Sequence, residues 1–560
     1  MTERPIARAA VLRKEHLAVL GCCALGSFAV ILWSWHHGAM LNYGDALAHL
    51  HIARRVLDSH RPGLTQLGSV WLPLPHLLMI PFVSVYAWWA NGIAGAIPSA
   101  LAYLAACTGL YRLARRWLEP VAAAVALAFF AANPNLLYLQ TTAMTEPLFL
   151  CEMIWAAVWL VEWRSSIETD PRKAGRLLWS IAIVLVAAVF TRYDGWILAL
   201  LAWTSIGVAL LRRGRLRSRA YWLASVLVVA APVLWFVYNA VYFGDWLDFA
   251  RGPYSASAIE LRTATPGWPP HPGWHNPWVS LLFFVKVAEM DAAPAGWGNV
   301  LLALSVFGTA WAWLIARRRA FLWALFLWLP LPFYIYSVAY GSVPIFLPVW
   351  WPHSWYNTRY GLEMLPAFAL GLGFAAHFAF TAIGEFKPRE SKRRWMAYSA
   401  SVLFAIVGLN VVELMREQPL TYVEGIKNVE SRRPFELEIP PALRSLLSKR
   451  PGGIVLMDTS VYPQLVTLTG IPLRQTINES DKEFYSAALA APAAHADLVL
   501  AFDGDEIDQA VHAHPEGLTA VGRYSAPGQA LATIYASDTP ASSTLNKPGR
   551  AVVASLKVIE

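Results

Sequence analysis

Charged side chains at the boundaries of apolar segments are the residues of this sequence best suited to chemistry. They are Asp45 in NYGDALAHL, Glu146 in TAMTEPLFL, Arg192 and Asp194 in TRYDGW, and Arg359 in NTRYGLEMLP. An ionisable group at a membrane boundary is costly to hold there and is therefore a functional candidate. Carboxylates can deprotonate a hydroxyl or hold a divalent cation, and guanidinium groups pair with phosphate oxygens through a bidentate fork.

Three neighbouring side chains extend these candidate groups. His49 follows Asp45 by four positions, so both side chains lie on one face if this stretch is helical. Tyr360 and Glu363 belong to the same short segment as Arg359, with Glu363 one turn deeper in the predicted helix. We expect four side chains to have supporting roles beside the candidate acids and arginines: His49, Asp194, Tyr360 and Glu363.

Each main candidate also has a purely structural interpretation. Asp45 would cap the amphipathic helix that follows it, and Glu146 would stabilise the positive end of the helix that starts at Pro147. Arg192 and Asp194 would form a local ion pair. If a divalent metal ion binds, its predicted ligands are Asp45, Glu146 and His49.

The composition shows which kind of protein must position these groups. Of the 560 residues, 57% are hydrophobic and only 15% are charged, with a mean hydropathy of +0.42. Soluble domains carry roughly 25% charged residues, so this chain is predicted to be a membrane protein. We expect a mostly helical, polytopic bundle of the kind that spans a bilayer.

Eleven apolar segments are long enough to cross a membrane, which requires about 17–25 residues. They cover residues 15–35, 96–112, 119–139, 147–163, 177–191, 196–211, 220–242, 297–316, 320–340, 360–383 and 396–415. The first follows four basic residues, as a signal peptide would. It lacks a clear small-residue cleavage site, so we interpret it as a retained first helix.

Basic residues indicate the orientation of these segments. The N-terminus and the five basic clusters between spans contain 24 Lys and Arg, whereas the proposed outer loops up to Arg359 contain 8. The clusters lie at 112–116, 164–176, 212–219, 317–319 and 387–394. Since basic loops stay in the cytoplasm, the N-terminus is predicted inside and the C-terminus outside. This distribution explains the net charge of +8 without a nucleic-acid partner.

Two long outer loops follow from this topology, 36–95 and 243–296. Within the first, residues 74–92 are apolar enough to cross, but a crossing there would place the basic cluster 112–116 outside. We therefore predict an interfacial or re-entrant helix. The second loop contains TPGWPPHPGWHNPW, which favours a rigid linker without helix and leaves open that it caps a cavity.

The composition changes at about residue 417, dividing the chain into a membrane domain, 1–416, and an extracytoplasmic domain, 417–560. In the second part GIVLMDTS, ADLVLAF, LTAVGRYSA and QALATIYAS are predicted strands. YPQLVTLTG, DKEFYSAALAAP and DEIDQAVHAHP are predicted helices. This alternation indicates a small α/β domain, and the tail after Pro540 is predicted to be loosely ordered.

These segments resemble the GT-C glycosyltransferase superfamily, and most of all its branch of protein O-mannosyltransferases and lipid A aminoarabinose transferases. The resemblance covers roughly residues 30–370. It depends on GDALAHLHIARRVLD, WLPLPHLLMIPF, PSALAYLAACTGLYRLARRW, TEPLFL, TRYDGW and RYGLEMLP, in that order. It implies an inverting sugar transfer from a polyprenyl-phosphate or dolichyl-phosphate donor.

The resemblance also implies roles for individual residues. Asp45 corresponds to the catalytic acid of the first outer loop, a general base, and Glu146 to a second acid near the site. Arg359 is implied as a ligand of the donor phosphate, with Arg192 and Tyr360 beside it. The first loop has one acid where many relatives have an adjacent pair, which argues against a metal. WWPHSW also lacks the acid of the oligosaccharyltransferase WWD signature.

The sequence therefore predicts a glycosyltransferase of the cell (inner) membrane that acts at the outer face on membrane lipid. The acceptor can be a protein, a lipid or a glycan. Two other function classes stay open at this point. A transporter or flippase would need repeated halves or broken helices, and a noncatalytic envelope-assembly scaffold would tolerate substitution of every outer acid.

Overall fold

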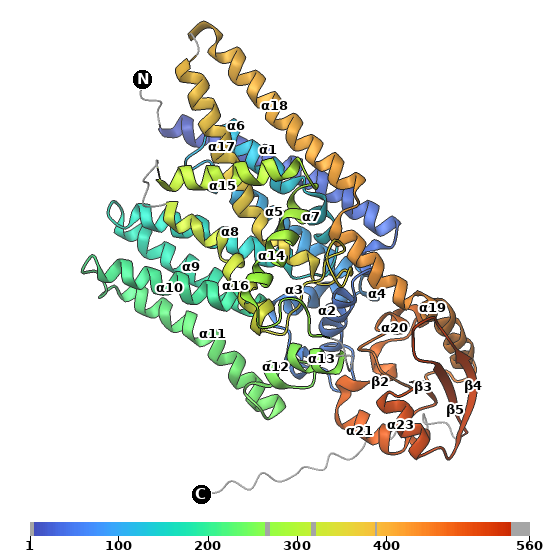
Figure 1. Ribbon diagram of the computed structural model, residues 1–560. Helices are drawn as coiled ribbons and strands as arrows, with labels where there is room; N and C mark the ends of the chain where they lie inside the picture. The colour runs from blue at the N-terminus through green and yellow to red at the C-terminus, as the bar shows by residue number, and fades with distance from the viewer. Residues whose placement is uncertain (1–4, 264–268, 315–320, 387–388, 539–560) are drawn as a thin grey trace, which may run out of the picture. The chain divides into compact units, whose positions relative to one another are not determined.

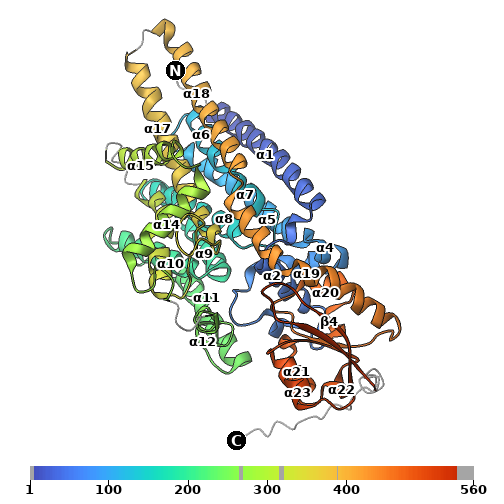
Figure 2. The same cartoon turned by 45° about the vertical axis from the view of Figure 1, so that its right-hand side comes forward.

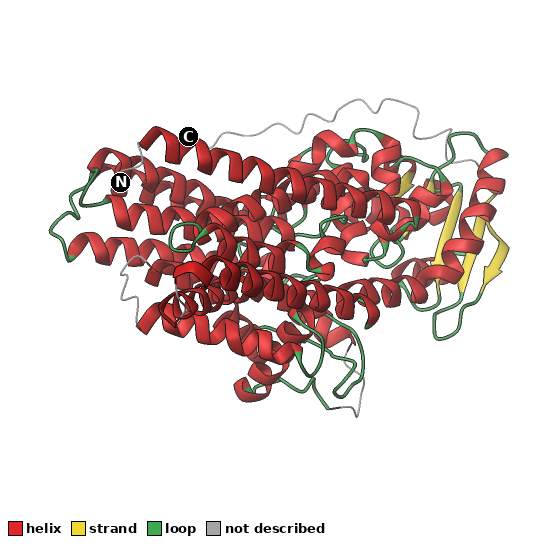
Figure 3. Ribbon diagram, turned by 90° about the horizontal axis from the view of Figure 1, so that it is seen from above, coloured by secondary structure: helices red, strands yellow, loops and turns green. Residues whose placement is uncertain are grey.

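Helices make up most of the chain, and the strands of the sheet all occur near the C-terminus (Figure 3). The structure is a computed structural model that describes residues 5–263, 269–314, 321–386 and 389–538. It divides into two compact units: Met1–Ala53 with Leu67–Asn428, and Arg54–Gln66 with Val429–Glu560. The predicted membrane and extracytoplasmic domains, 1–416 and 417–560, stay a prediction, since compactness does not show where the bilayer lies.

The first unit is a bundle of long apolar helices. Its longest elements are α1 (Pro5–His36), α5 (Ile93–Ala114), α8 (Glu146–Ser166), α9 (Pro171–Thr191), α10 (Asp194–Leu211), α11 (Arg219–Phe243), α15 (Gly298–Leu314), α17 (Leu365–Phe386) and α18 (Arg389–Arg416). Helices α8 to α11 lie side by side (Figure 1). Helix α6 (Pro120–Ala131) packs with α17 and α18 (Figure 2).

Eight helices within the described residues are long and apolar enough to cross a membrane. They are Lys14–His36, Ile93–Ala114, Pro171–Thr191, Asp194–Leu211, Arg219–Phe243, Phe321–Tyr340, Thr358–Ile383 and the apolar part of Arg394–Ser448. The chain is thus a multi-pass membrane protein, and the predicted class of a helical membrane bundle is confirmed. The count of eleven crossings stays a prediction. The basic cluster 317–319 and part of 387–394 lie outside the described residues.

Within the described residues, each of the eleven predicted spans falls mainly on helical structure, but two are interrupted. The span predicted at 119–139 is divided into α6 and α7 (Pro134–Leu139), because the Asn133 side chain caps α7 and Pro134 begins it. The span predicted at 320–340 consists of the 3-10 helix η3 (Phe321–Trp328) followed by α16 (Pro330–Tyr340).

The apolar stretch 74–92 forms two short helices, α3 (Leu74–Val83) and α4 (Tyr86–Asn91), separated at Ser84 and Val85. A helix of 10 residues spans about 15 Å, half of the hydrocarbon core. Neither helix can cross alone, which agrees with the interfacial or re-entrant interpretation.

The predicted outer loop 243–296 contains more helix than the sequence suggested. It holds α12 (Asp248–Arg251), α13 (Ala256–Thr263) and α14 (Pro277–Ala292). Of the Pro- and Trp-rich stretch 265–278, residues 265–268 lie outside the described part. The rest is irregular up to Asn276, whose side chain caps α14 by accepting from the Val279 amide.

A glycine pair sets the close crossing of α15 and α17. A Cβ on Gly371 would lie 2.1 Å from the carbonyl oxygen of Ser305, and one on Gly308 would lie 2.0 Å from the carbonyl oxygen of Gly371. Only glycine at both positions lets the two backbones touch, as in small-residue packing between membrane helices.

The second unit contains a five-stranded mixed sheet of order β2-β1-β3-β5-β4. Strands β1 (Val455–Met457), β2 (Thr476–Ile477) and β3 (Leu498–Phe502) are parallel, whereas β4 (Leu518–Tyr524) and β5 (Ala532–Ser537) form an antiparallel hairpin. Its helices are α20 (Gln464–Thr469), α21 (Glu483–Ala490), α22 (Pro492–His495) and α23 (Glu506–Ala513). The predicted small α/β domain is confirmed, with β2 as an additional strand. The tail after Pro540 lies outside the described residues.

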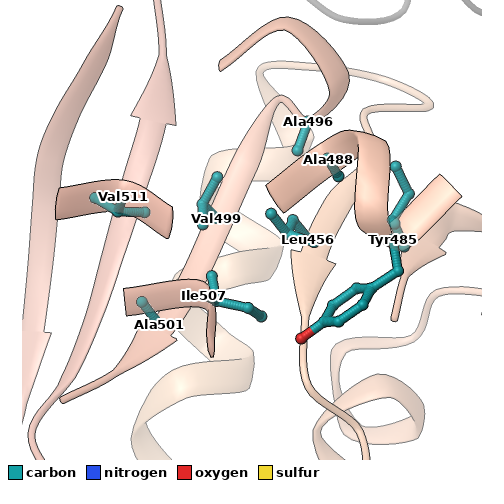
Figure 4. Packing of buried hydrophobic residues seen from close by; sticks show 9 residues of the cluster. Leu456, Tyr485, Ala488, Ala496, Val499, Ala501, Ile507 and Val511 are labelled. Atoms are coloured by element: carbon teal, nitrogen blue, oxygen red, sulfur yellow. The ribbon is translucent and has the colours of Figure 1, made fainter. Parts of the chain in front are cut away.

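Apolar side chains of the central strands and the covering helices form the core of this unit (Figure 4). Strand β3 is buried along its whole length, so it reads as a continuous apolar run. Strand β4 at the edge is largely exposed and carries Arg523, a charge that discourages pairing with another chain. The core cluster is Leu456, Ile477, Tyr485, Ala488, Ala496, Val499, Ala501, Ile507 and Val511.

Two helices begin in the first unit and end in the second. Helix α2 (Gly44–Arg55) follows the short turn η1 (Ala39–Leu41), and its last two residues belong to the second unit. Helix α19 (Leu420–Ser448) passes from one unit to the other after Asn428. The sequence did not predict α19, whose interior contains three prolines.

Candidate active site

Arg359 joins three carboxylates that come from distant parts of the first unit. Its Nη2 lies 2.5 Å from Oδ2 of Asp45, and its Nε lies 3.0 Å from Oε1 of Glu146. Its Nη1 lies 3.2 Å from Oε1 of Glu424. Each edge of the guanidinium therefore donates to an acid, and 314 residues separate Arg359 from Asp45 along the chain.

Arg192 forms a second centre that shares one of these acids. Its Nη1 lies 3.1 Å from the same Glu146 Oε1, and its Nε lies 3.1 Å from Oδ2 of Asp194. Its Nη2 lies 3.1 Å from Oε1 of Glu363 and donates to the Tyr334 hydroxyl at 2.7 Å. The expected local pair of the TRYDGW segment is present, but it is only one part of a larger network.

Two tyrosine rings pack against the guanidinium groups. The ring of Tyr360 lies 5.1 Å from the Cζ atoms of both Arg192 and Arg359, within the range of cation–π attraction. Tyr334 stacks on Tyr360 at 4.9 Å and donates to Glu363 at 2.7 Å. The network thus joins both arginines through an aromatic face as well as through Glu146.

Local backbone structure brings these residues together at the ends of helices. Helix α9 ends at Thr191, the extended backbone of Arg192 breaks the chain direction, and α10 begins at Asp194. Helix α8 begins at Glu146 with Pro147 in its first turn. Arg359 belongs to the 3-10 helix η4 (Thr358–Met364), in which positions three apart eclipse. Tyr360 and Glu363 therefore point to the same side.

Asp45 differs from the other acids of the network in its exposure. Its side chain is 43% exposed, whereas those of Glu146 and Glu424 are each 1% exposed and that of Arg359 is 7% exposed. Among the acids of this network, Asp45 is the one that a substrate can reach without moving the protein. It lies in the first turn of α2, which begins at Gly44, so Asp45 is a residue of the helix and not the N-cap that its structural interpretation predicted. Its carboxylate contacts Arg359 from this position.

His49 is buried behind Asp45 on the same helix. Its Nδ1 lies 2.8 Å from Nε2 of His76, and its ring packs at 4.5 Å from that of Trp71. Burial is the main cause that lowers the pKa of His49 to about 4, against the opposing charges of Asp45 and Glu146. The imidazole is therefore neutral at pH 7 and has a structural partner.

The predicted metal ligands Asp45, Glu146 and His49 do not fit a metal site in this arrangement. Within the described residues, no group of three or more His, Cys, Asp or Glu is arranged to hold a metal ion. Glu146 Oε1 is shared by two guanidinium groups, and His49 Nδ1 bonds to another imidazole. These side chains are committed to the protein's own partners.

The structure also adds residues that the sequence did not single out. Glu424 was assigned to the outer domain, and Tyr334 lies in an apolar helix without any charge pattern. Asp291, at the end of α14, is fully buried, and burial raises its pKa well above the ordinary range. Asp291 could have been noticed only as an acid within a largely apolar stretch of the predicted loop. Nothing in the local sequence distinguishes Glu424 from its acidic neighbours.

Most of the chain is similar in structure to solved structures of one protein. ArnT from Cupriavidus metallidurans bound to undecaprenyl phosphate matches with a TM-score of 0.54 at 14% identity, over 91% of this chain and 97% of that one. The apo form of the same protein matches with a TM-score of 0.52 at 15% identity, over 92% and 97%. This chain has the GT-C fold.

The predicted resemblance to GT-C proteins is therefore confirmed at the level of the fold. The Archaeoglobus fulgidus oligosaccharyltransferase in complex with Zn and sulfate, another GT-C protein, matches with a TM-score of 0.48 at 11% identity, over 92% of this chain and 72% of that one. No protein-family model and no curated protein sequence matches the chain. At this identity the GT-C fold is shared, while the roles of single residues depend on the geometry described above.

Proposed function

We propose that this GT-C chain is an inverting glycosyltransferase that moves a sugar from a polyprenyl-phosphate donor to an acceptor at the outer face of the cell membrane. One observation carries the proposal. An exposed carboxylate, Asp45, lies 2.5 Å from the guanidinium of Arg359, which two buried acids hold in place. The solved ArnT structure with undecaprenyl phosphate supports the class of donor.

Asp45 serves as the general base in this mechanism. It accepts the proton of an acceptor hydroxyl while that oxygen attacks the anomeric carbon of the sugar. A bond forms between the acceptor oxygen and the anomeric carbon, and the bond from that carbon to the phosphate oxygen breaks. The polyprenyl phosphate leaves with the electron pair of that bond, and attack from the opposite side inverts the anomeric centre.

Arg359 offsets the charge that develops on the leaving phosphate. The three nitrogens of its guanidinium already donate to carboxylates, and only the Asp45 edge faces an exposed partner. A donor phosphate therefore binds by taking the place of Asp45 at Nη2. This exchange frees the Asp45 carboxylate for the acceptor proton at the moment when the donor is bound.

The remaining predicted residues have supporting roles in this proposal. Glu146 bridges both arginines and fixes their spacing, while Tyr360 presents its ring to both guanidinium groups. Arg192 is the second phosphate ligand, and Asp194 and Glu363 hold it by their carboxylates. His49, neutral and buried, supports the helix that carries the base.

The orientation follows from the distribution of basic residues. We propose that the N-terminus is cytoplasmic and that the outer loops and the C-terminal unit are extracytoplasmic, in the inner membrane of the cell. The acceptor is a hydroxyl-bearing protein, lipid or glycan, because the base requires a proton to remove.

The test is an Asp45→Asn variant assayed for transfer of a labelled sugar from undecaprenyl phosphate. Loss of a general base lowers the rate by about 10²- to 10⁴-fold, and the matched control Asp503→Asn, at an exposed acid of the second unit, retains wild-type transfer. Full transfer by Asp45→Asn would exclude this residue as the base. Translocation of the lipid in proteoliposomes without any sugar transfer would instead identify a flippase.

A further inference from the structure

Glu424 on α19 is the most heavily hydrogen-bonded acid in the network around Arg359. Its side chain is almost completely buried, and both of its oxygens accept bonds. The donors are the amides of Asn357 at 2.8 Å and Thr358 at 3.1 Å, Oγ1 of Thr358 at 2.6 Å, Nη1 of Arg359 at 3.2 Å and the hydroxyl of Tyr43 at 3.3 Å.

Three of these five donors are the Asn357 amide and the amide and hydroxyl of Thr358, where η4 begins. The first amides of a helix have no partner within it and need an acceptor from elsewhere. Asn357, just before η4, has a left-handed backbone with φ of 56°, and its own side chain does not cap the helix. Glu424 supplies the missing cap from another helix.

The first turn of α19 is itself fastened to the bundle, which fixes where Glu424 can be. The Thr421 amide donates to Oδ1 of Asn135 at 2.9 Å, and the Tyr43 hydroxyl donates to the Thr421 carbonyl at 2.7 Å. Nδ2 of Asn135 donates in turn to the Asp291 carbonyl at 3.1 Å. Glu424, one helical turn after Thr421, therefore extends from a rigid base.

We infer that Glu424 is a positioning residue that holds the Arg359 guanidinium in the orientation in which the edge that faces Asp45 meets the donor phosphate. Glu424 contacts both the guanidinium and the backbone segment that leads to it, so it fixes the side chain from two ends. Glu146 cannot do this alone, since its Oε1 also accepts from Arg192. This inference rests on the proposed function, because it assigns the held arginine to a phosphate.

A merely structural role for Glu424 would have a different signature. It would lower the stability and the amount of folded protein, while the folded fraction bound the donor normally. A positioning role changes the affinity for a lipid phosphate and the chemical reactivity of Arg359 in protein that remains folded. The two roles are separable by measurements on one set of variants.

The experiment compares full-length Glu424→Gln and Glu424→Asp with wild type in lipid nanodiscs. The first variant keeps the shape and removes the charge, whereas the second keeps the charge and shortens the reach by one methylene. Glu417→Gln, at an exposed acid just before α19, is the matched control. Readouts are the Kd for undecaprenyl phosphate, the rate at which phenylglyoxal modifies Arg359 as mapped by mass spectrometry, and the Tm.

We expect Glu424→Gln to weaken undecaprenyl phosphate binding by about tenfold to a hundredfold, the value of one hydrogen bond between charged groups. We expect phenylglyoxal to modify Arg359 faster in both Glu424 variants than in wild type. In the control variant the rate of modification is unchanged. Wild-type binding and wild-type reactivity in either folded variant would overturn the inference. If wild type transfers no sugar from any polyprenyl phosphate, the proposed function fails, and Arg359 reactivity still shows whether Glu424 holds the guanidinium.

Discussion

Replacement of Arg359 by lysine keeps the positive charge and removes the planar fork, so it isolates what the geometry of the guanidinium contributes. The native side chain donates through three different nitrogens to Asp45, Glu146 and Glu424. A lysine ammonium is a single point charge on a flexible stem. It cannot reach three acids that surround a guanidinium on different edges.

The loss of stability depends on which hydrogen-bond donors each acid keeps after the substitution. Glu146 keeps its 3.1 Å contact with Arg192, and Glu424 keeps the amide of Asn357 at 2.8 Å. Asp45 is exposed and is solvated by water instead. No carboxylate is left buried without a donor, so the loss is about 2–3 kcal/mol, near that of one charged hydrogen bond, rather than the 3–5 kcal/mol of a broken buried pair.

The same loss of interaction energy also has a large effect on donor binding. Without the guanidinium, the donor phosphate loses the Nη2 donor that Glu146 and Glu424 hold in place, and we expect the KM for undecaprenyl-phosphate sugar to rise by about 30- to 150-fold from the same energy. The assay measures initial rates against donor concentration in nanodiscs, together with the Tm. Arg251→Lys, an exposed arginine paired with Asp245, is the control and changes neither value. An Arg359→Lys enzyme with the native KM would refute the assignment of this arginine to the phosphate.

Two further predictions concern stability. Because the folded-state pKa of His49 is about 4 and that of an unfolded histidine is about 6.5, the unfolded chain binds more protons between these values. Stability therefore falls as the pH drops through this window, by about 2 kcal/mol at pH 5. His49→Asn should make the Tm less sensitive to acid, and an unchanged pH dependence would contradict the assignment. Separately, Gly371→Ala places a methyl group 2.1 Å from a carbonyl oxygen of α15 and should cost about 1–3 kcal/mol. Gly408→Ala on α18, where a Cβ meets nothing within 4 Å, should cost nothing, and equal Tm values for both variants would show that the helix crossing is not tightly packed.

Much of the fold was predictable because it depends on hydropathy and on the spacing of polar and apolar residues, which both follow directly from the order of residues along the chain. Apolar runs of sufficient length predicted the long apolar helices of the bundle, though not α14 or α19, and alternating strand and helix patterns predicted the C-terminal sheet. Interruptions were harder to predict. The cap at Asn133 and the 3-10 helix η3 lie within runs whose average hydropathy shows nothing unusual.

Part of the site was predictable for a similar reason. Asp45, Glu146, Arg192 and Arg359 were recognised because each is a charge at the predicted outer end of an apolar segment, and the structure joins all four in one network. The predicted metal ligation was not supported by the geometry, since His49 turns toward His76. Spacing on a helix places two side chains on one face, but it does not decide which neighbour each one meets.

The sequence by itself determined the membrane bundle and singled out the acids and arginines at the predicted ends of its apolar segments, while the orientation of the bundle stays a prediction. Hydropathy and the position of charges along the chain are sufficient for these features. Only the tertiary structure decided which carboxylate meets which guanidinium, because that depends on how segments hundreds of residues apart pack. Glu424 is the clearest case: it lies in a stretch that resembles a soluble domain, and only the packing of the first turn of α19 on the bundle brings it to Arg359.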